Sequence, residues 1–127
     1  MSAAVLVESG RVLVSLRLPD DGRHADLWEF PGGTLEPGET AEEALVREIR
    51  EELDLSIVAG TLYERVIYED GNTRIDVRFF RVARVSGEPR ALEVAKWEWA
   101  GPARLRELEF LPSNRAVRDR LADELRD

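Results

Sequence analysis

The order of the elements that the sequence predicts favours an α+β fold, or a mixed β-sheet sandwiched between helices. Runs rich in β-branched and aromatic residues open the chain, an amphipathic helix follows, long β-rich runs return, and a helix closes the chain. No repeat, linker or low-complexity tract interrupts the 127 residues. We therefore expect one domain that spans residues 1–127.

The first predicted elements are short strands. The runs Ala3–Val7 and Val12–Leu16 flank the turn residues Glu8–Arg11, and this pattern predicts a hairpin. The polar stretch Arg17–Asp26 is typical of a loop and precedes a short apolar and aromatic strand, Leu27–Phe30. That strand leads into a glycine-rich turn.

The most clearly predicted element is a helix over Thr40–Leu53. Thr40 is the expected N-cap, and Glu43 stands three residues later, which is the pattern of a capping box. The apolar residues that recur at helical spacing are Leu45, Val46, Ile49 and Leu53. Asp54 follows where helices often end in a left-handed residue, a conformation that costs aspartate about 1 kcal/mol more than glycine.

The second half of the chain predicts three strands and two helices. Ser56–Glu69 and Thr73–Val85 are long β-rich runs, and Asp70-Gly71-Asn72 between them is a strong turn signal. The remaining predicted elements are a strand over Lys96–Ala100, a short helix from Pro102 to Leu108, and a last helix that Ser113 caps.

The composition excludes several classes of partner and chemistry. The net charge is −8, whereas a protein that binds a nucleic-acid polymer usually carries a basic face, so we expect no DNA or RNA partner. The absence of cysteine excludes disulfides, zinc–thiolate sites and cysteine nucleophiles. His24 is the only histidine, lies in the polar loop, and is expected to be solvated. No segment resembles a signal peptide or approaches the ~18 apolar residues of a membrane span, so we expect a cytoplasmic protein without a membrane partner.

Three carboxylates on the predicted helix indicate a cation site. Glu48, Glu51 and Glu52 are related by helical spacings that bring side chains together on one surface. A hard cation such as Mg²⁺ or Mn²⁺ would relieve their repulsion, and Arg47 can orient Glu51. An acidic helix face alone is more often a solvated surface. The glycine turn ahead of the helix favours a binding site, and the loop after it brings a fourth carboxylate, Glu39, towards the same place as a candidate substrate-binding residue.

This combination resembles the Nudix signature, G-x5-E-x7-R-E-U-x-E-E-x-G-U, in which U is an aliphatic residue. Gly33, Glu39 and the run Arg47–Leu55 match every fixed position except the last glycine, which is Asp54 in this chain. The resemblance implies an α/β/α sandwich around a central mixed sheet and hydrolysis of nucleoside diphosphates linked to another group. It further implies Arg47 as an orienting residue, Mg²⁺ as the cofactor with Mn²⁺ as a possible substitute, and, as metal ligands, Glu48, Glu51, Glu52 and the carbonyl of Gly32.

The flanks of the signature resemble the MutT-type nucleoside triphosphate pyrophosphohydrolases. The shared stretches are Leu27–Gly33, Gly87–Pro89 followed by Glu93 and Trp99, and Leu111–Asn114. The resemblance implies that Glu93 contacts the metal or acts as a base, that Asn114 reads an oxidised purine, and that Phe30 lines the base pocket. Arg17 ends a strand near the place where these proteins hold nucleotide-contacting arginines.

The residues alone leave alternatives open at these outer positions. Asn114 also suits the first turn of a helix, Phe30 suits a plain core, Glu93 an exposed loop and Arg17 the surface.

We expect a Mg²⁺-dependent hydrolase that cleaves a nucleoside triphosphate to the monophosphate and pyrophosphate. The catalytic candidates are Arg47, Glu51, Glu52 and Glu93. An oxidised purine such as 8-oxo-dGTP is the first expected substrate, with sanitation of the nucleotide pool as the role. The alternatives are CTP or dCTP, ADP-ribose, a dinucleoside polyphosphate, or a non-catalytic nucleotide sensor. The expected partner is a small nucleotide, and the protein is a monomer or a homodimer.

Overall fold

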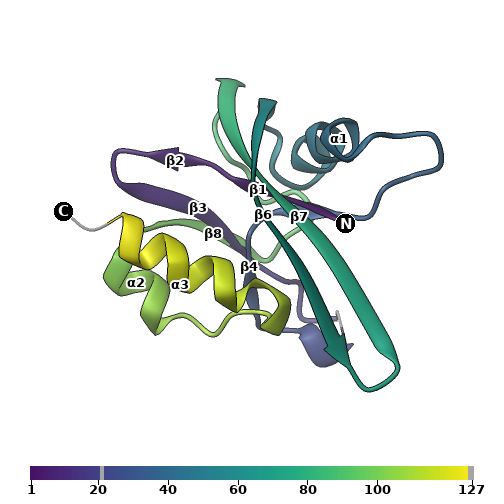
Figure 1. The fold of residues 1–127 in the computed structure, drawn as a ribbon. Helices are drawn as coiled ribbons and strands as arrows, with labels where there is room; N and C mark the ends of the chain where they lie inside the picture. The colour runs from purple at the N-terminus through teal and green to yellow at the C-terminus, as the bar shows by residue number, and fades with distance from the viewer. Residues whose placement is uncertain (21, 126–127) are drawn as a thin grey trace.

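The computed structural model describes residues 1–20 and 22–125, and their strands form two sheets (Figure 1). The first sheet has the order β5-β1-β7-β6. Its strands are β1 (Ser2–Val5), β5 (Gly32–Gly33), β6 (Ser56–Asp70) and β7 (Thr73–Ser86). β1 is parallel to β7, whereas β5 and β6 are antiparallel to their neighbours, so the sheet is mixed. Residue 21 of the predicted loop Arg17–Asp26 lies outside the described residues. Residues 126 and 127, at the end of the predicted domain, also lie outside them.

The second sheet is built around β3. Its strands are β2 (Val7–Glu8), β3 (Arg11–Leu16), β4 (Trp28–Glu29) and β8 (Lys96–Ala100), and the other three each pair antiparallel with β3. A 3₁₀ turn over Gly22–His24 lies in the stretch between β3 and β4.

The predicted hairpin between Ala3–Val7 and Val12–Leu16 is wrong for most of its first strand. Only β2 pairs with β3, and the preceding strand β1 lies in the other sheet beside β7. Ala3 and Val5 pack into one apolar core and Ala4 into another, so β1 is covered on both faces. A strand buried on both faces suits a parallel position inside a sheet rather than a hairpin edge.

The helix α1 (Ala41–Leu53) begins and ends as predicted. The Thr40 hydroxyl accepts the Glu43 N–H at 3.1 Å, and the Glu43 carboxylate accepts the Thr40 N–H at 2.8 Å, which completes the capping box. Asp54 at the C-cap has φ 57° and ψ 32°, the predicted left-handed conformation.

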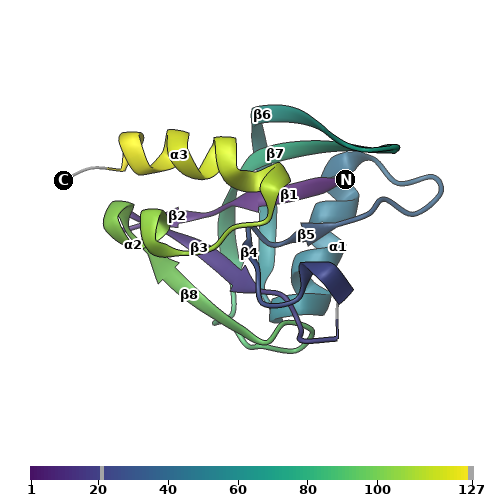
Figure 2. The ribbon, with the colours of Figure 1, turned by 90° about the horizontal axis from the view of Figure 1, so that it is seen from below.

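Helices cover both sides of the strands (Figures 1 and 2). On one side, Leu45, Ile49 and Leu53 of α1 pack into a core with Leu6 and Phe80. On the other side, α2 (Pro102–Glu107) and α3 (Arg115–Glu124) contribute Leu105, Val117 and Leu121 to a core with Phe30, Phe79 and Phe110. Two cores separated by strands make an α/β/α sandwich and confirm the predicted fold class. None of the helices in the described residues is long and apolar enough to cross a membrane.

The predicted cap of the last helix is wrong. Ser113 lies inside a 3₁₀ turn over Pro112–Asn114, and α3 begins at Arg115 with Asn114 as its N-cap. The Ser113 hydroxyl instead accepts a hydrogen bond from Asn114 Nδ2 at 3.2 Å. The turn that begins at Pro112 therefore moves the start of the helix beyond the serine and buries Ser113 and Asn114.

Candidate active site

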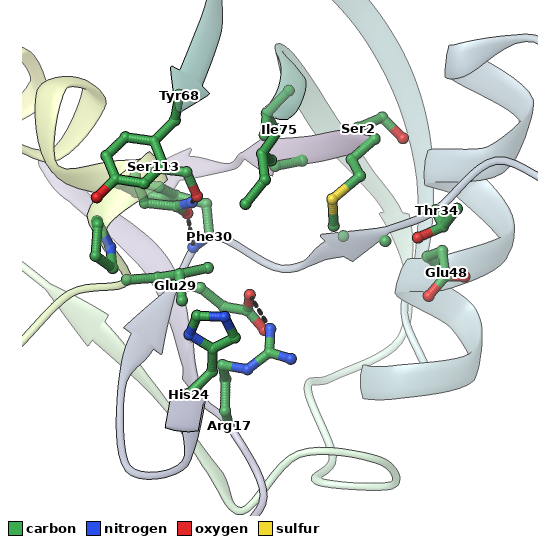
Figure 3. A pocket seen from close by; sticks show the side chains of 18 of the residues that line it. Ser2, Arg17, His24, Glu29, Phe30, Thr34, Glu48, Tyr68, Ile75 and Ser113 are labelled. Carbon is green, nitrogen blue, oxygen red and sulfur yellow. Dashed lines mark hydrogen bonds and ion pairs between the residues drawn. The ribbon is translucent and has the colours of Figure 1, made fainter. Parts of the chain in front are cut away.

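A cavity of about 430 Å³ lies between α1, β4, β5, the β6–β7 hairpin and the start of α3. Glu48 and Thr34 lie at one end of the cavity, and Phe30, Tyr68 and Ser113 lie at the other (Figure 3). The cavity therefore joins an acidic end on α1 to a partly aromatic end beside α3.

Arg47 gathers the acids at the edge of the acidic end. Its guanidinium donates to both carboxylate oxygens of Glu39 at 2.8 and 2.9 Å and to the Thr34 carbonyl at 3.1 Å. It also donates to Glu48 Oε1 at 2.8 Å and to Glu51 Oε2 at 3.3 Å. Arg47 holds the pKa of Glu39 down at about 2, so Glu39 stays ionised. The guanidinium thus fixes where Glu48 lies relative to the preceding loop.

The structure does not bring every predicted acid to the cavity. Glu48 and Glu52 line it, but Glu39 and Glu51 do not. Glu51 is exposed and interacts with Arg47, as its helical spacing predicts. Glu39 is engaged by Arg47 and by the Glu36 N–H, at 2.8 Å from Glu39 Oε1. Direct contacts of Glu39 with substrate and of Glu51 with metal remain predictions.

Glu52 is the most perturbed acid of the site. Burial raises its pKa to about 9, and the charges of Glu29 and Glu48 add to the effect. Its Oε1 atom is buried and makes no hydrogen bond within the described residues. A buried carboxylate oxygen without a donor favours the neutral acid until a cation compensates the charge.

The donor set fits a divalent cation, although the side chains are not gathered around one point. Within residues 1–20 and 22–125, no group of three or more His, Asp or Glu side chains stands close enough to hold a metal ion. The carboxylates of Glu48 and Glu52 and the carbonyl of Gly32 are hard oxygen donors of the kind that Mg²⁺ prefers. The orphaned Oε1 of Glu52 gives this assignment its structural support.

The loop after β7 brings Glu93 to the same end. The backbone N–H groups of Leu92 and Glu93 both donate to the Glu52 carbonyl, at 3.0 and 3.1 Å. Glu93 lines the cavity with an exposed side chain. The structure therefore places the predicted loop acid beside the predicted helix acid.

The other end of the cavity combines core and pocket roles. Phe30 is 1% exposed, and its ring packs against Phe79 and Phe110 at centroid distances of 6.0 and 5.3 Å. Its backbone N–H donates to Asn114 Oδ1 at 3.0 Å, across 84 positions of sequence. Phe30 and Asn114 both line the cavity, so the alternatives of core residue and pocket residue both apply to Phe30.

Several lining residues are not predicted from the sequence. Arg17 does line the cavity, and its Nη1 donates to Glu29 Oε1 at 2.9 Å, which makes Glu29 part of the site. Tyr68 and Ile75 reach it from the β6–β7 hairpin, and His24 is half-buried at its edge rather than fully solvated. The place of Glu29 follows from its pairing with Ser15 of β3, and the sequence does not reveal this register of β4 on β3.

The two glycines of β5 have different neighbours, and this leads to a first prediction. A Cβ on Gly33 would overlap the Glu48 carboxylate, whereas a Cβ on Gly32 would overlap the Ser2 carbonyl and the Ala3 Cα. We expect Gly33→Ala to displace a side chain and lower metal affinity about tenfold with little loss of stability. Gly32→Ala should instead lower the free energy of unfolding by about 1–3 kcal/mol, because backbone must move.

Isothermal titration with Mn²⁺ and urea unfolding of both variants test this difference. Equal metal affinity in Gly33→Ala and wild type would show that Glu48 does not bind the cation from its observed position.

Comparison with known proteins assigns the fold and the site to a class. The chain matches the NUDIX domain family over residues 1–121. The protein therefore belongs to the Nudix hydrolase family, whose members generally need a divalent metal.

Relatives within the family act on nucleotides. The 8-oxo-dGTP diphosphatase of Escherichia coli (strain K12) is 36% identical over 110 residues, which cover 87% of this chain and 84% of that protein. The CTP pyrophosphohydrolase of the same strain is 31% identical over 112 residues, covering 88% and 82%. The crystal structure of the MutT protein from Methanosarcina mazei Go1 shares the fold, with a TM-score of 0.83 and 24% identity over 99% of this chain and 94% of that chain.

Proposed function

We propose that this protein hydrolyses a nucleoside triphosphate to the monophosphate and pyrophosphate, with Mg²⁺ as cofactor and an oxidised purine such as 8-oxo-dGTP as preferred substrate. The observation that carries the proposal is one cavity that joins Glu48, Glu52 and Glu93 to Phe30 and Asn114. Such a cavity suits a ligand with a phosphate chain at one end and a base at the other. The 36% identity to an 8-oxo-dGTP diphosphatase supports the choice of base.

The acidic end would bind the phosphate chain through the cation. Glu48, Glu52 and the Gly32 carbonyl would hold the ion, and Glu51 is a further candidate ligand. When bound, the cation supplies charge neutralisation and Lewis-acid polarisation at phosphorus. Arg47 orients Glu48 from the side of the preceding loop. The Glu93 carboxylate is exposed and lines the cavity, so it is available to accept the proton of the attacking water.

The far end would bind the nucleoside. Asn114 Oδ1 accepts from the Phe30 N–H and its Nδ2 donates to Ser113, so the carboxamide is held in one orientation. A carboxamide has two N–H donors and two acceptor lone pairs, and a base edge can use those that remain. Phe30 supports this wall from the core, and Arg17 and Glu29 border the side of the pocket.

A second candidate function is hydrolysis of CTP, because a CTP pyrophosphohydrolase is 31% identical over most of the chain. Steady-state kinetics with Mg²⁺ across 8-oxo-dGTP, dGTP, dCTP, CTP and ADP-ribose separate the candidates. Equal kcat/KM for dGTP and 8-oxo-dGTP would reject sanitation as the role, and a preference for CTP would establish the second candidate. If no nucleotide is turned over, the non-catalytic nucleotide sensor is the remaining candidate.

A second prediction concerns Asn114→Ala. We expect a loss of about 1–3 kcal/mol (roughly 5- to 150-fold) in the discrimination between 8-oxo-dGTP and dGTP. The Phe30 N–H would also lose its partner, so the free energy of unfolding should fall by about 1–3 kcal/mol. The ratio of kcat/KM for the two nucleotides measures the discrimination, and urea unfolding measures the stability.

Ser113→Ala is the matched control, since it removes only the acceptor of Asn114 Nδ2. A uniform fall in kcat/KM for all nucleotides in Asn114→Ala would assign Asn114 a structural role alone.

A further inference from the structure

The loop that carries Glu93 is fastened to the C-terminal end of α1. Arg90 N–H donates to the Leu53 carbonyl at 2.8 Å, in addition to the two hydrogen bonds that Leu92 and Glu93 make to the Glu52 carbonyl. The last carbonyls of a helix have no partners within the helix, so this loop supplies them. Figure 2 shows the loop between β7 and β8 passing beside the end of α1.

These contacts tie the position of one candidate acid to another. Glu52 presents its carboxylate to the cavity, and its carbonyl accepts the backbone N–H of Glu93. The placement of the Glu93 side chain therefore depends on how firmly the loop stays on the helix end.

Asp54 stands at the point where this chain departs from the Nudix signature. The left-handed conformation favours glycine, and a negative charge at a helix C-terminus opposes the helix dipole. Both effects make aspartate a poor choice for stability at this position. Asp54 Oδ2, however, lies 3.4 Å from Arg90 Nη1, in the loop that carries Glu93.

The stability that the Asp54–Arg90 ion pair adds to the fold is too small to explain why aspartate stands at this position. The two side chains are 42% and 70% exposed, and ion pairs this exposed are weak. The loop is otherwise held by backbone hydrogen bonds to the end of α1 and, at its start, by contacts of Arg84 with the Gly87 carbonyl and the Glu88 carboxylate. A weak contact beside Glu93 matters more to such a loop than to the whole fold.

We propose that Asp54 and Arg90 are positioning residues whose ion pair holds the loop over residues 87–93 on the end of α1 and so fixes Glu93 beside Glu52. This inference rests on the proposed role of Glu93 and adds to it the residues that set its position. It gives a role to Asp54, the fixed position of the signature that this chain does not match.

The test combines exchange, stability and kinetics. Asp54→Asn keeps a side chain that tolerates the left-handed conformation and removes only the charge. We expect the amide protons of Leu92 and Glu93 to exchange about three- to fivefold faster in the metal-free variant, as the loss of an exposed ion pair allows. We expect kcat to fall about three- to fivefold with KM within about twofold, because Glu93 acts after binding. Arg90→Gln should reproduce both changes and Arg90→Lys should largely restore them.

Asp54→Gly separates positioning from stability. Glycine relieves the left-handed backbone, so Tm should rise by about 3 °C while exchange at Leu92 and Glu93 quickens and kcat falls. Ser9→Gly is the matched control, since Ser9 has φ 52° in the turn between β2 and β3. It should raise Tm without changing loop exchange or kcat.

The double variant Asp54→Asn/Arg90→Gln should be no worse than either single variant, because both remove one interaction. Unchanged exchange in Asp54→Asn, or effects that multiply in the double variant, would overturn the inference. Absence of nucleotide hydrolysis in the wild type would reject the proposed function, but the exchange and Tm measurements would still test the ion pair.

Discussion

Replacing Glu52 by glutamine is expected to lower kcat about 10³-fold with the fold intact. The substitution keeps the shape of the side chain but removes an anionic oxygen donor, so the phosphate chain loses charge compensation where it reacts. Pyrophosphate release from the best nucleotide of the panel, with saturating Mg²⁺, measures the loss. Unchanged kcat would remove Glu52 from the metal site.

The same variant has a stability signature that does not depend on activity. The pKa of Glu52 is raised from 4.5 to about 9 in the metal-free fold, so the folded state retains a proton that the unfolded state releases. The stability that this proton contributes is present below pH 4.5 and is lost as the pH rises towards about 9. Urea unfolding in the presence of a chelator should show this decline in wild type, and Glu52→Gln should show a smaller one.

Two other glutamates on α1 provide comparison. Glu42→Gln changes an exposed residue in the first turn and should leave kcat within about twofold. Glu51→Gln tests the ligand that the signature implies but that lies outside the cavity lining. A loss in Glu51→Gln as large as in Glu52→Gln would indicate that Glu51 leaves Arg47 and enters the site when the cation binds.

Local sequence rules predict the elements whose determinants lie within a few residues. The capping box at Thr40, the left-handed Asp54 and the turn at Gly71 each depend on adjacent backbone, and all three are confirmed. The i,i+4 spacing on α1 likewise predicts the contact of Arg47 with Glu51.

Features that depend on distant partners are the ones the sequence does not predict. β1 leaves the expected hairpin because β7, more than 70 residues later, covers its edge. The place of Glu29 in the site follows from the register of β4 on β3 and from its contact with Arg17. Ser113 loses its predicted capping role because a 3₁₀ turn over Pro112–Asn114 precedes α3, and the Asn114 carboxamide ties that turn to Phe30, 84 positions earlier.

Replacing Phe30 by alanine is expected to give the largest loss of stability, about 3–5 kcal/mol in the free energy of unfolding. The ring is 1% exposed and contacts Phe79 and Phe110, so truncation leaves a cavity in the core beneath the nucleoside end of the site. Urea unfolding with chelator present measures the loss without interference from bound metal.

The comparison of Phe30→Leu with Phe110→Leu separates packing from base recognition. Both substitutions keep most of the buried volume, and Phe110 does not line the cavity. Both should cost about 1–2 kcal/mol of stability, but only Phe30→Leu should change the ratio of kcat/KM for 8-oxo-dGTP and dGTP. If the two variants change that ratio equally, Phe30 acts on the nucleoside only through the packing of the core, and of the two residues predicted for this end Asn114 alone remains a candidate for base discrimination.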